Sequence, residues 1–167
     1  MDATYQLRRS LPRDAAELQA ACWPEWSLDS VRELLVRAEG IASQGRGLGV
    51  VACKGHHILG YGQLTRWPRA AEISDLIVTP AYRGNGVGTA IIVYLIDQAR
   101  AWHIPGVEIG AALANPRAMS LYERLGFVED RIIDLDLGYG LEPVMYLSMR
   151  FDEYSDNPEK SASGSAH

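Results

Sequence analysis

The stretch TPAYRGNGVGT, from Thr79 to Thr89, decides the fold of this 167-residue chain. It follows a segment rich in branched residues, Glu72–Val78, which predicts a strand, and a helical pattern runs from about Gly86 to Trp102. A helix that begins inside a glycine-rich turn presents unpaired backbone N–H groups and the positive end of its dipole, and glycines let a ligand approach the backbone closely. The stretch therefore predicts a phosphate-binding turn between a strand and a helix.

The charge pattern around the turn agrees with this interpretation. Between Asp75 and Asp97, Arg83 is the only charged residue. A helix without acidic residues in its first turns forgoes a favourable interaction with its dipole. Room for a bound anion would explain that pattern.

Other glycine-rich phosphate motifs fit the chain poorly. A P-loop requires Gly-Lys followed by Ser or Thr, which the sequence lacks. The dinucleotide-binding pattern GxGxxG needs its third glycine one place after Gly88, and the acidic residue about 20 positions further on is not convincingly placed. The alternating glycines from Gly45 to Gly49 precede a strand rather than a helix, which is typical of a flexible lead into a hairpin.

The pattern that remains, Arg83-x-x-Gly86-x-Gly88, resembles the coenzyme A-binding signature of the GNAT acetyltransferase family. A second segment, NPRAMSLYERLGF from Asn115 to Phe127, resembles another motif of that family, N-x-x-A-x-x-x-Y-x-x-x-G-F. The resemblance in element order covers about residues 4 to 150. It implies an N-acetyltransferase that uses acetyl-CoA as co-substrate, with no metal.

The resemblance also assigns the cofactor contacts. Asn115 would hydrogen-bond the pantetheine region or order nearby water, and Tyr122 would lie beside the thioester sulfur. The seven positions between them correspond to about two helical turns, or ~10 Å, so both side chains can project toward one edge of the sheet. Taken alone, Tyr122 also fits a core residue of an amphipathic helix with its hydroxyl at the rim. The expected acetyl-CoA contacts are Ile77, Val78, Arg83, Gly84, Asn85, Gly86, Val87, Gly88, Thr89, Asn115 and Tyr122.

Acetyl transfer to an amine needs a base, because a lysine-like amine has a pKa near ~10.4 and attacks only when neutral. Glu72 lies eleven positions before Arg83, where some GNAT enzymes place a catalytic glutamate, and Asp75 is the competing candidate. Alternation places the two carboxylates on opposite faces of a regular strand, so at most one faces the cleft unless a bulge intervenes. Each also fits an ordinary solvated or salt-bridged carboxylate.

Two other groups complete the chemistry that the resemblance implies. A backbone N–H near Ile77 or Val78 would stabilise the charge that develops on the thioester oxygen. Tyr122 is the best placed donor of a proton to the departing thiolate. The expected acceptor is a small-molecule primary amine. A protein N-terminus or lysine side chain as acceptor, and a non-catalytic acyl-CoA-binding module, are the alternatives.

The acceptor pocket is expected among the first two helices and the loop of the last hairpin. A tryptophan pair in the first region fits this role, but packing of the helix junction is an equally good interpretation. His56 and His57 are adjacent without a further ligand cluster, so no metal site is expected. The aromatic rings and carboxylates that suit a cationic amine are Trp23, Trp26, Asp136, Tyr139 and Glu142.

The whole sequence predicts a single domain of residues 1–150 and a disordered tail of residues 151–167, which are polar, small and unpatterned. The expected fold is α+β with three layers, a mixed and mostly antiparallel central sheet of GNAT type flanked by helices. Its order is β-α-α-β-β-β-α-β-α-β-β. Helices are expected from about 12, from 27 or 29 to 40, at 86–102 and at 116–125, and strands at 4–9, 47–53, 58–65, 72–78, 107–112, 128–137 and 144–149.

Composition narrows the function classes. Apolar residues make up 47% and charged residues 22%, which excludes pervasive disorder, and the net charge of −5 argues against a nucleic-acid partner. The longest strongly apolar stretch, residues 90–96, is far shorter than the ~20 residues of a membrane helix, and no signal peptide is expected. We therefore expect a cytoplasmic protein, a monomer or a homodimer, in which Cys22 and Cys53 are reduced.

Overall fold

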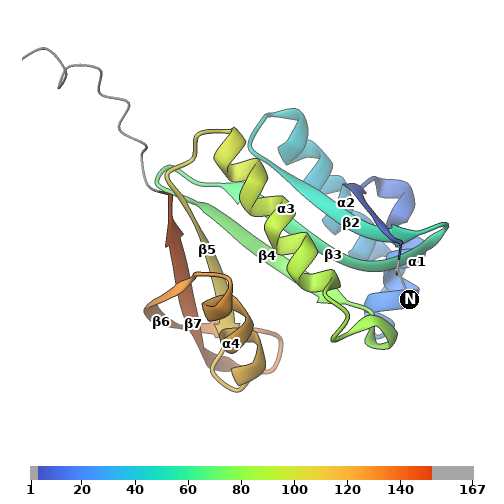
Figure 1. Ribbon diagram of the computed structural model, residues 1–167. Coiled ribbons are helices and arrows are strands. Elements are labelled where there is room, and N and C mark those ends of the chain that lie inside the picture. Colours follow the sequence, from blue (N-terminus) through green and yellow to red (C-terminus); the bar gives the residue numbers. More distant parts are fainter. Residues whose placement is uncertain (1–3, 152–167) are drawn as a thin grey trace, which may run out of the picture.

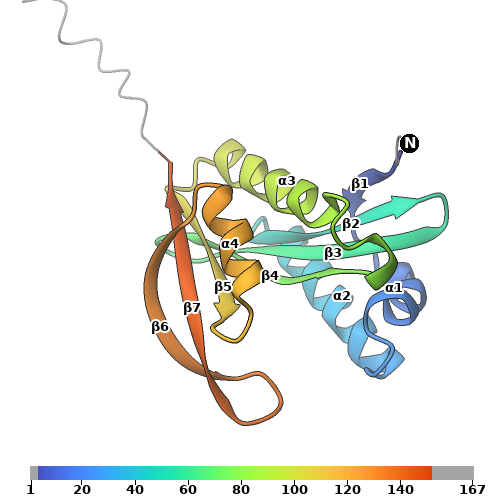
Figure 2. The same cartoon turned by 60° about the horizontal axis from the view of Figure 1, so that its bottom comes forward.

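Residues 4–151 are described by a computed structural model, in which seven strands form one mixed sheet flanked by helices (Figures 1 and 2). The strand order is β1-β2-β3-β4-β5-β7-β6, and every neighbouring pair is antiparallel except β4 and β5. The predicted fold class and order of elements are confirmed. The elements are β1 Gln6–Arg9, η1 Pro12–Asp14, α1 Ala15–Cys22, α2 Leu28–Ser43, β2 Gly47–Lys54, β3 His57–Arg66, β4 Ala71–Val78, η2 Pro80–Tyr82, α3 Val87–Ala101, β5 Gly106–Ala112, α4 Pro116–Arg124, β6 Val128–Asp136 and β7 Leu141–Arg150.

Helices cover both faces of the first half of the sheet, β1 to β4 (Figure 2). α3 packs on one face, where Ile91 and Leu95 join an apolar core with Ile73 of β4. α1 and α2 pack on the opposite face, where Val31 contributes to a second core with Tyr61 of β3. Both helix layers bury apolar side chains against the sheet, and this burial is the main favourable contribution to folding.

α2 continues past Gly40, where the sequence analysis predicted its end. A glycine weakens a helix but ends it only where the backbone turns to positive φ. That turn comes at Gly45, which has a φ of 68°, and the Arg46 N–H donates back to the Ile41 carbonyl at 2.9 Å. The prediction that a glycine ends α2 named the wrong glycine, Gly40 instead of Gly45.

β4 and β5 separate soon after they meet. Their parallel pairing consists of only three residue pairs, from Ala71 opposite Val107 to Ile73 opposite Ile109, although β4 runs on to Val78. Beyond Ile73 the two strands diverge, and β5, β6, β7 and α4 lean away from the rest of the sheet (Figure 1). The backbone edge of β4 after Ile73 therefore has no partner strand on that side within the described residues.

A bulge interrupts β4 at Asp75. On β3 the register advances two residues, from Gln63 to Tyr61, while the partners on β4 advance three, from Ser74 to Ile77. The extra residue lies in the left-handed region, with a φ of 54° at Asp75. This conformation is uncommon outside glycine, although aspartate tolerates it better than most residues.

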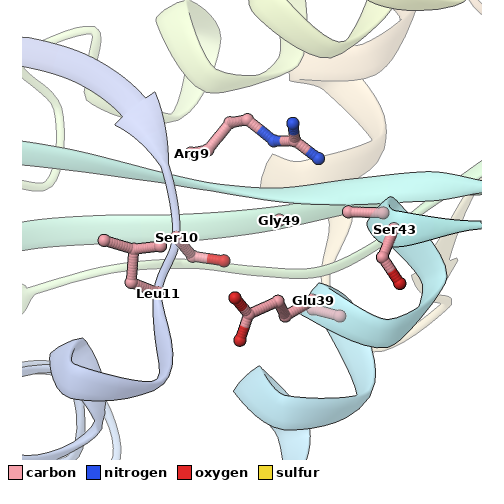
Figure 3. Close-up of a pocket in the computed structure, with 8 residues that line it drawn as sticks. Arg9, Ser10, Leu11, Glu39, Ser43 and Gly49 are labelled. Carbon is pink, nitrogen blue, oxygen red and sulfur yellow. The ribbon is translucent and has the colours of Figure 1, made fainter. Parts of the chain in front are cut away.

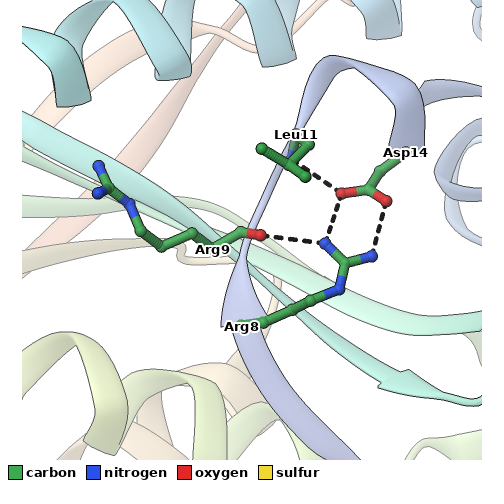
Figure 4. A network of polar contacts seen from close by, with 4 residues as sticks. All are labelled: Arg8, Arg9, Leu11 and Asp14. Atoms are coloured by element: carbon green, nitrogen blue, oxygen red, sulfur yellow. Dashed lines mark hydrogen bonds and ion pairs between the residues drawn. The ribbon is translucent and has the colours of Figure 1, made fainter.

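A buried carboxylate fixes the path from β1 into the first helices (Figure 4). Asp14 accepts two hydrogen bonds from the Arg8 guanidinium, at 2.9 and 2.7 Å, and one from the Leu11 N–H at 2.8 Å. Burial alone would raise the pKa of Asp14, but the Arg8 and Leu11 hydrogen bonds outweigh it and lower that pKa. The ion pair thus stabilises the start of the chain most when Asp14 is ionised.

Three expectations concern the rest of the chain. Of the predicted tail, only Phe151 lies within the described residues, and its N–H donates to the Pro105 carbonyl at 2.9 Å. Cys22 and Cys53 are both buried and unpaired, and burial raises the pKa of the Cys22 thiol to about 11. Within residues 4–151, no helix combines the length and apolar character required to cross a membrane.

Candidate active site

The glycine turn, which is expected to bind phosphate, has an open backbone. Gly84 and Gly86 adopt φ values of 79° and 81°, and no heavy atom lies within 4 Å of the position that a Cβ would occupy at either residue. Gly86 occupies the N-cap of α3, so no side chain caps the first N–H groups of the helix, and its first turn holds no acidic residue. These N–H groups are therefore available to an anion.

The turn opens onto a cleft of about 690 Å³ between the end of β4 and α4. The lining includes ten of the eleven residues expected to contact acetyl-CoA. The exception is Asn85, which is exposed and donates from its Nδ2 to the Arg83 carbonyl at 3.3 Å. The ten are Ile77, Val78, Arg83, Gly84, Gly86, Val87, Gly88, Thr89, Asn115 and Tyr122.

Some of these residues shape the cleft rather than offer a polar side chain to it. Val87 is almost fully buried in the core, and Gly88 lies against Val78, whose Cγ2 is 3.5 Å from the position of an added Cβ. Arg83 donates from its Nε to the Val78 carbonyl at 3.2 Å. The turn is thereby held against the end of β4.

The sequence analysis missed two cations of the cleft, Arg117 and Arg124. Both lie on α4, which places two more positive charges beside the site where the turn would hold phosphates. Their spacing of seven residues, close to two helical turns, is the signal that could have identified them.

Tyr122 and Asn115 line the wall of the cleft that α4 forms. Tyr122 is only 6% exposed and packs edge-to-face with Phe127 at 6.2 Å between ring centroids. Burial raises the pKa of Tyr122, so the phenol stays protonated and can donate a proton. Asn115 uses its Oδ1 to cap α4, accepting from the Ala118 N–H at 3.2 Å, so its amide Nδ2 is the group that remains for a ligand.

The two candidate bases lie on the same side of the sheet, because the bulge breaks the alternation expected for β4. Glu72 is in register with Thr65 of β3 and Glu108 of β5. Asp75 interacts electrostatically with Tyr61 and with Arg37 of α2, both on the face that α1 and α2 cover. Among the ion pairs of residues 4–151, none includes either carboxylate.

The surroundings of Asp75 change its pKa. Although the residue is exposed to solvent on one side, desolvation by the surrounding protein raises the pKa of its carboxyl. A hydrogen bond from the Ser74 hydroxyl at 3.3 Å and the positive charge of Arg37 oppose that increase. A carboxyl with a raised pKa is a better proton acceptor than an ordinary one.

The residues expected to bind the acceptor lie outside this cleft. Trp23 and Trp26 stack at 4.7 Å between centroids. Trp23 also meets Tyr61 edge-on at 6.0 Å, which fits packing of the helix junction, whereas Trp26 is 44% exposed and can contact a ligand. Asp136 accepts a hydrogen bond from the Gly138 N–H at 2.8 Å within the β6–β7 turn. The other hairpin residues are Tyr139, fully exposed at the tip, and Glu142, half-buried on β7.

A hydrogen bond joins the residue before the glycine turn to α1. The Thr79 hydroxyl donates to the Ala21 carbonyl at 2.9 Å, across 58 positions of sequence. The start of the phosphate turn is thus attached to the last turn of α1.

A smaller cavity of about 280 Å³ lies on the opposite face, between the end of β1 and α2 (Figure 3). Arg9, Ser10, Glu39 and Ser43 line it with mixed polar groups. Within the described residues, His, Cys, Asp and Glu side chains form no group of three that could hold a metal ion.

Comparison with known proteins gives a consistent result. The profile of the Acetyltransferase (GNAT) family matches residues 13–127. An uncharacterized N-acetyltransferase of Methanocaldococcus jannaschii is 34% identical over 89 residues, covering 53% of this chain and 38% of that protein. A glucosamine 6-phosphate N-acetyltransferase of Trypanosoma brucei brucei is 35% identical over 77 residues, covering 45% of this chain and 50% of that protein. The chain thus spans half or less of the length of both relatives.

A solved structure shares the fold over nearly its whole length. The structure of yncA from Salmonella typhimurium, a putative acetyltransferase with its cofactor acetyl-CoA, superposes with a TM-score of 0.72 at 22% identity, covering 90% of this chain and 96% of that one. At that identity the likeness concerns the arrangement of strands and helices.

Proposed function

The chain belongs to the GNAT acetyltransferase family, whose members are acetyl-CoA-dependent acyltransferases, and we propose that it moves an acetyl group from acetyl-CoA to a primary amine of a small molecule. One observation carries the proposal. The glycine turn, the unpaired edge of β4 and Tyr122 all border one cleft of about 690 Å³.

In this proposal the turn holds the phosphates of acetyl-CoA. The N–H groups at the start of α3 provide the binding site, with Arg83, Arg117 and Arg124 as cations around it. The pantetheine arm follows the free edge of β4, where backbone groups after Ile73 can pair with its amides. Asn115 contacts the arm through its Nδ2.

The acetyl group is then transferred directly to the amine. Glu72 is the first candidate for the base that removes the proton of the amine, directly or through water, and Asp75 is the second. A backbone N–H near Ile77 or Val78 stabilises the charge on the thioester oxygen, and Tyr122 protonates the departing thiolate. Holding the two substrates together supplies much of the remaining rate increase.

The small-molecule acceptor is supported by the relative from Trypanosoma brucei brucei, whose name gives an amino sugar phosphate as its substrate. The acceptor is expected to bind near α1 and α2. Aromatic and acidic side chains there, such as Trp26 and Asp75, suit a cationic amine. The proposal includes a cytoplasmic location and a monomeric or homodimeric state.

A thiol-release screen over a library of amines tests the proposal. With acetyl-CoA as donor, we expect release of free coenzyme A with at least one small primary amine, and calorimetry to give micromolar binding of acetyl-CoA. Peptides with free N-termini or lysines belong in the same screen, and turnover with these alone would favour a protein acceptor. Binding without turnover of any amine would indicate a non-catalytic acyl-CoA-binding module, and the absence of binding would overturn the proposal.

A further inference from the structure

A cluster of charged side chains lies on the second half of the sheet, on the side opposite α4. It comprises Glu72 of β4, Glu108 of β5, Arg131 of β6 and Tyr146 of β7, and we call it the Arg131 cluster. Glu72 and Glu108 are direct neighbours in the parallel pairing, and Arg131 is the direct neighbour of Tyr146 in the antiparallel pairing of β6 and β7. Four strands that are separate in sequence thus bring these side chains together.

Arg131 is the centre of this cluster. Its two Nη atoms donate to the two carboxylate oxygens of Glu108, each at 3.1 Å, and Nη1 also donates to Asp130 at 2.9 Å. Its guanidinium carbon lies 4.9 Å from the centre of the Tyr146 ring. The side chain is thus oriented by a bidentate ion pair and an aromatic face at the same time.

The ion pair leaves the two neighbouring glutamates in different situations. Like charges directly opposite each other on adjacent strands repel. Arg131 compensates Glu108, whereas no ion pair within the described residues includes Glu72. Glu72 lies close to Tyr146. Burial raises the pKa of the Tyr146 phenol most, and the charge and hydrogen bonding of Glu72 raise it further.

The strand partners of Glu72 within residues 4–151 are not cations. Its neighbour on β3 is Thr65, a neutral hydroxyl, and its neighbour on β5 is Glu108. Tyr146 faces it from β7, and Arg131 with Asp130 lies beyond on β6. Arg37 of α2 interacts with Asp75 rather than with Glu72.

We propose that Arg131 is a positioning residue for the acetyl transfer: by compensating Glu108 it preserves the ability of Glu72 to take the proton of the amine as the pH falls. The inference rests on the proposed function, in which Glu72 is the first candidate base. Without Arg131, the uncompensated charge of Glu108 lies opposite Glu72 on the adjacent strand and opposes a negative charge there, so activity should be lost earlier on the acidic side of the pH profile.

Arg131→Met tests this inference through the pH profile of kcat/KM. Two charges ~6 Å apart near a protein surface interact strongly enough to move the acidic limb upward by about 0.5 to 1 pH unit. We expect kcat/KM to fall roughly threefold to tenfold below that limb and to stay unchanged on the plateau. Because the pair is partly exposed, 1 M NaCl should remove most of the shift.

Two further variants separate charge from structure. Arg131→Lys keeps the charge, so its acidic limb should stay near that of the unsubstituted protein. Glu108→Gln combined with Arg131→Met removes both charges and should return the limb, which a merely structural loss would not do. Arg32→Met, in the exposed Arg32–Asp29 pair of α2, is the matched control and should change nothing. A limb that moves equally in all four variants would overturn the inference.

Carbon-13 NMR of labelled glutamates distinguishes this inference from the proposed function, because it follows Glu72 without turnover. In Arg131→Met we expect the titration midpoint of the Glu72 carboxyl to rise together with the acidic limb. A midpoint that does not move overturns the inference, whatever the activity. If the titration midpoint of Glu72 moves while the acidic limb of kcat/KM stays in place, Glu72 is not the base. In that case Arg131 has no role in positioning it.

Discussion

The two halves of the sheet differ in how they are covered. In the first half, β2 and β3 are buried at nearly every position, because α3 lies on one face and α1 and α2 lie on the other. In the second half, β6 is exposed at every position except Leu135. Within the sheet, three residue pairs of β4 and β5 join the halves, and one apolar core continues from under α3 to α4. We therefore expect the first half to contribute more of the stability, while the divergence of the second half leaves the cleft between β4 and α4.

Truncations in the two halves test this division most directly. Leu95→Ala, at a fully buried position of α3, should lower the free energy of unfolding by about 3 kcal/mol, because it leaves a cavity in the core. Ile132→Ala removes a side chain that is 54% exposed on β6 and should cost about 0.5 kcal/mol or less. Urea denaturation measures both. Equal losses would show that the second half carries as much of the stability as the first.

Gly86→Glu sharpens the comparison at the mouth of the cleft. A carboxylate at the start of α3 would fill the phosphate site and repel the ligand, so we expect affinity for acetyl-CoA to fall by roughly 100-fold or more. Gly55→Glu is the matched control, since Gly55 also has positive φ and open space around it but lies in the β2–β3 turn of the first half. Calorimetry that finds equal affinities for the two variants would contradict the assignment of the turn.

Tyr122→Phe tests the opposite wall of the cleft. Loss of the hydroxyl removes the proposed proton donor, so kcat should fall about tenfold to a hundredfold while the KM for acetyl-CoA hardly changes. Tyr94→Phe on α3, a half-buried tyrosine outside the cleft lining, serves as the control. If Tyr122→Phe abolishes cofactor binding and spares the rate, its proposed role is wrong.

Asp14→Asn should have the smallest effect of the four predictions in this comparison. Its effect should be limited to the first half of the molecule. The folded pKa of Asp14 is lowered, so its contribution to stability is present above the unfolded pKa of about 3.9 and is lost as pH falls toward the folded pKa. We expect a loss of about 1–2 kcal/mol at pH 7, limited because Arg8 is partly exposed. This difference from the unsubstituted protein should shrink steadily below about pH 4. Asp29→Asn, in an exposed pair, is the control.

The features that depend on local sequence could be predicted. Branched strands, the glycine turn and the order of elements follow from periodicity and turn chemistry within short windows, and the glycines of the turn have the positive φ that they allow. A similar local rule failed at Gly40, because α2 runs through that residue and the positive φ that follows the helix comes at Gly45.

The features that depend on strand register could not be predicted. The bulge at Asp75 places Glu72 and Asp75 on one side, and no pattern within β4 itself announces it. The contact of Glu108 with Arg131 joins residues 23 positions apart through β7, and it appears only once the pairing of three strands is known. A single sequence contains these residues but not the alignment that makes them neighbours.

The hydrogen bond from Thr79 to Ala21 connects ligand binding at the glycine turn to tryptophan fluorescence. It attaches the start of the glycine turn to the helix that leads into the stacked rings of Trp23 and Trp26. Indole emission depends on ring environment, so occupation of the turn should alter the fluorescence of that stack. The chain has four tryptophans, and replacing Trp67 and Trp102 by phenylalanine would leave the stack as the sole indole emitter, a label-free signal for titrating the cofactor.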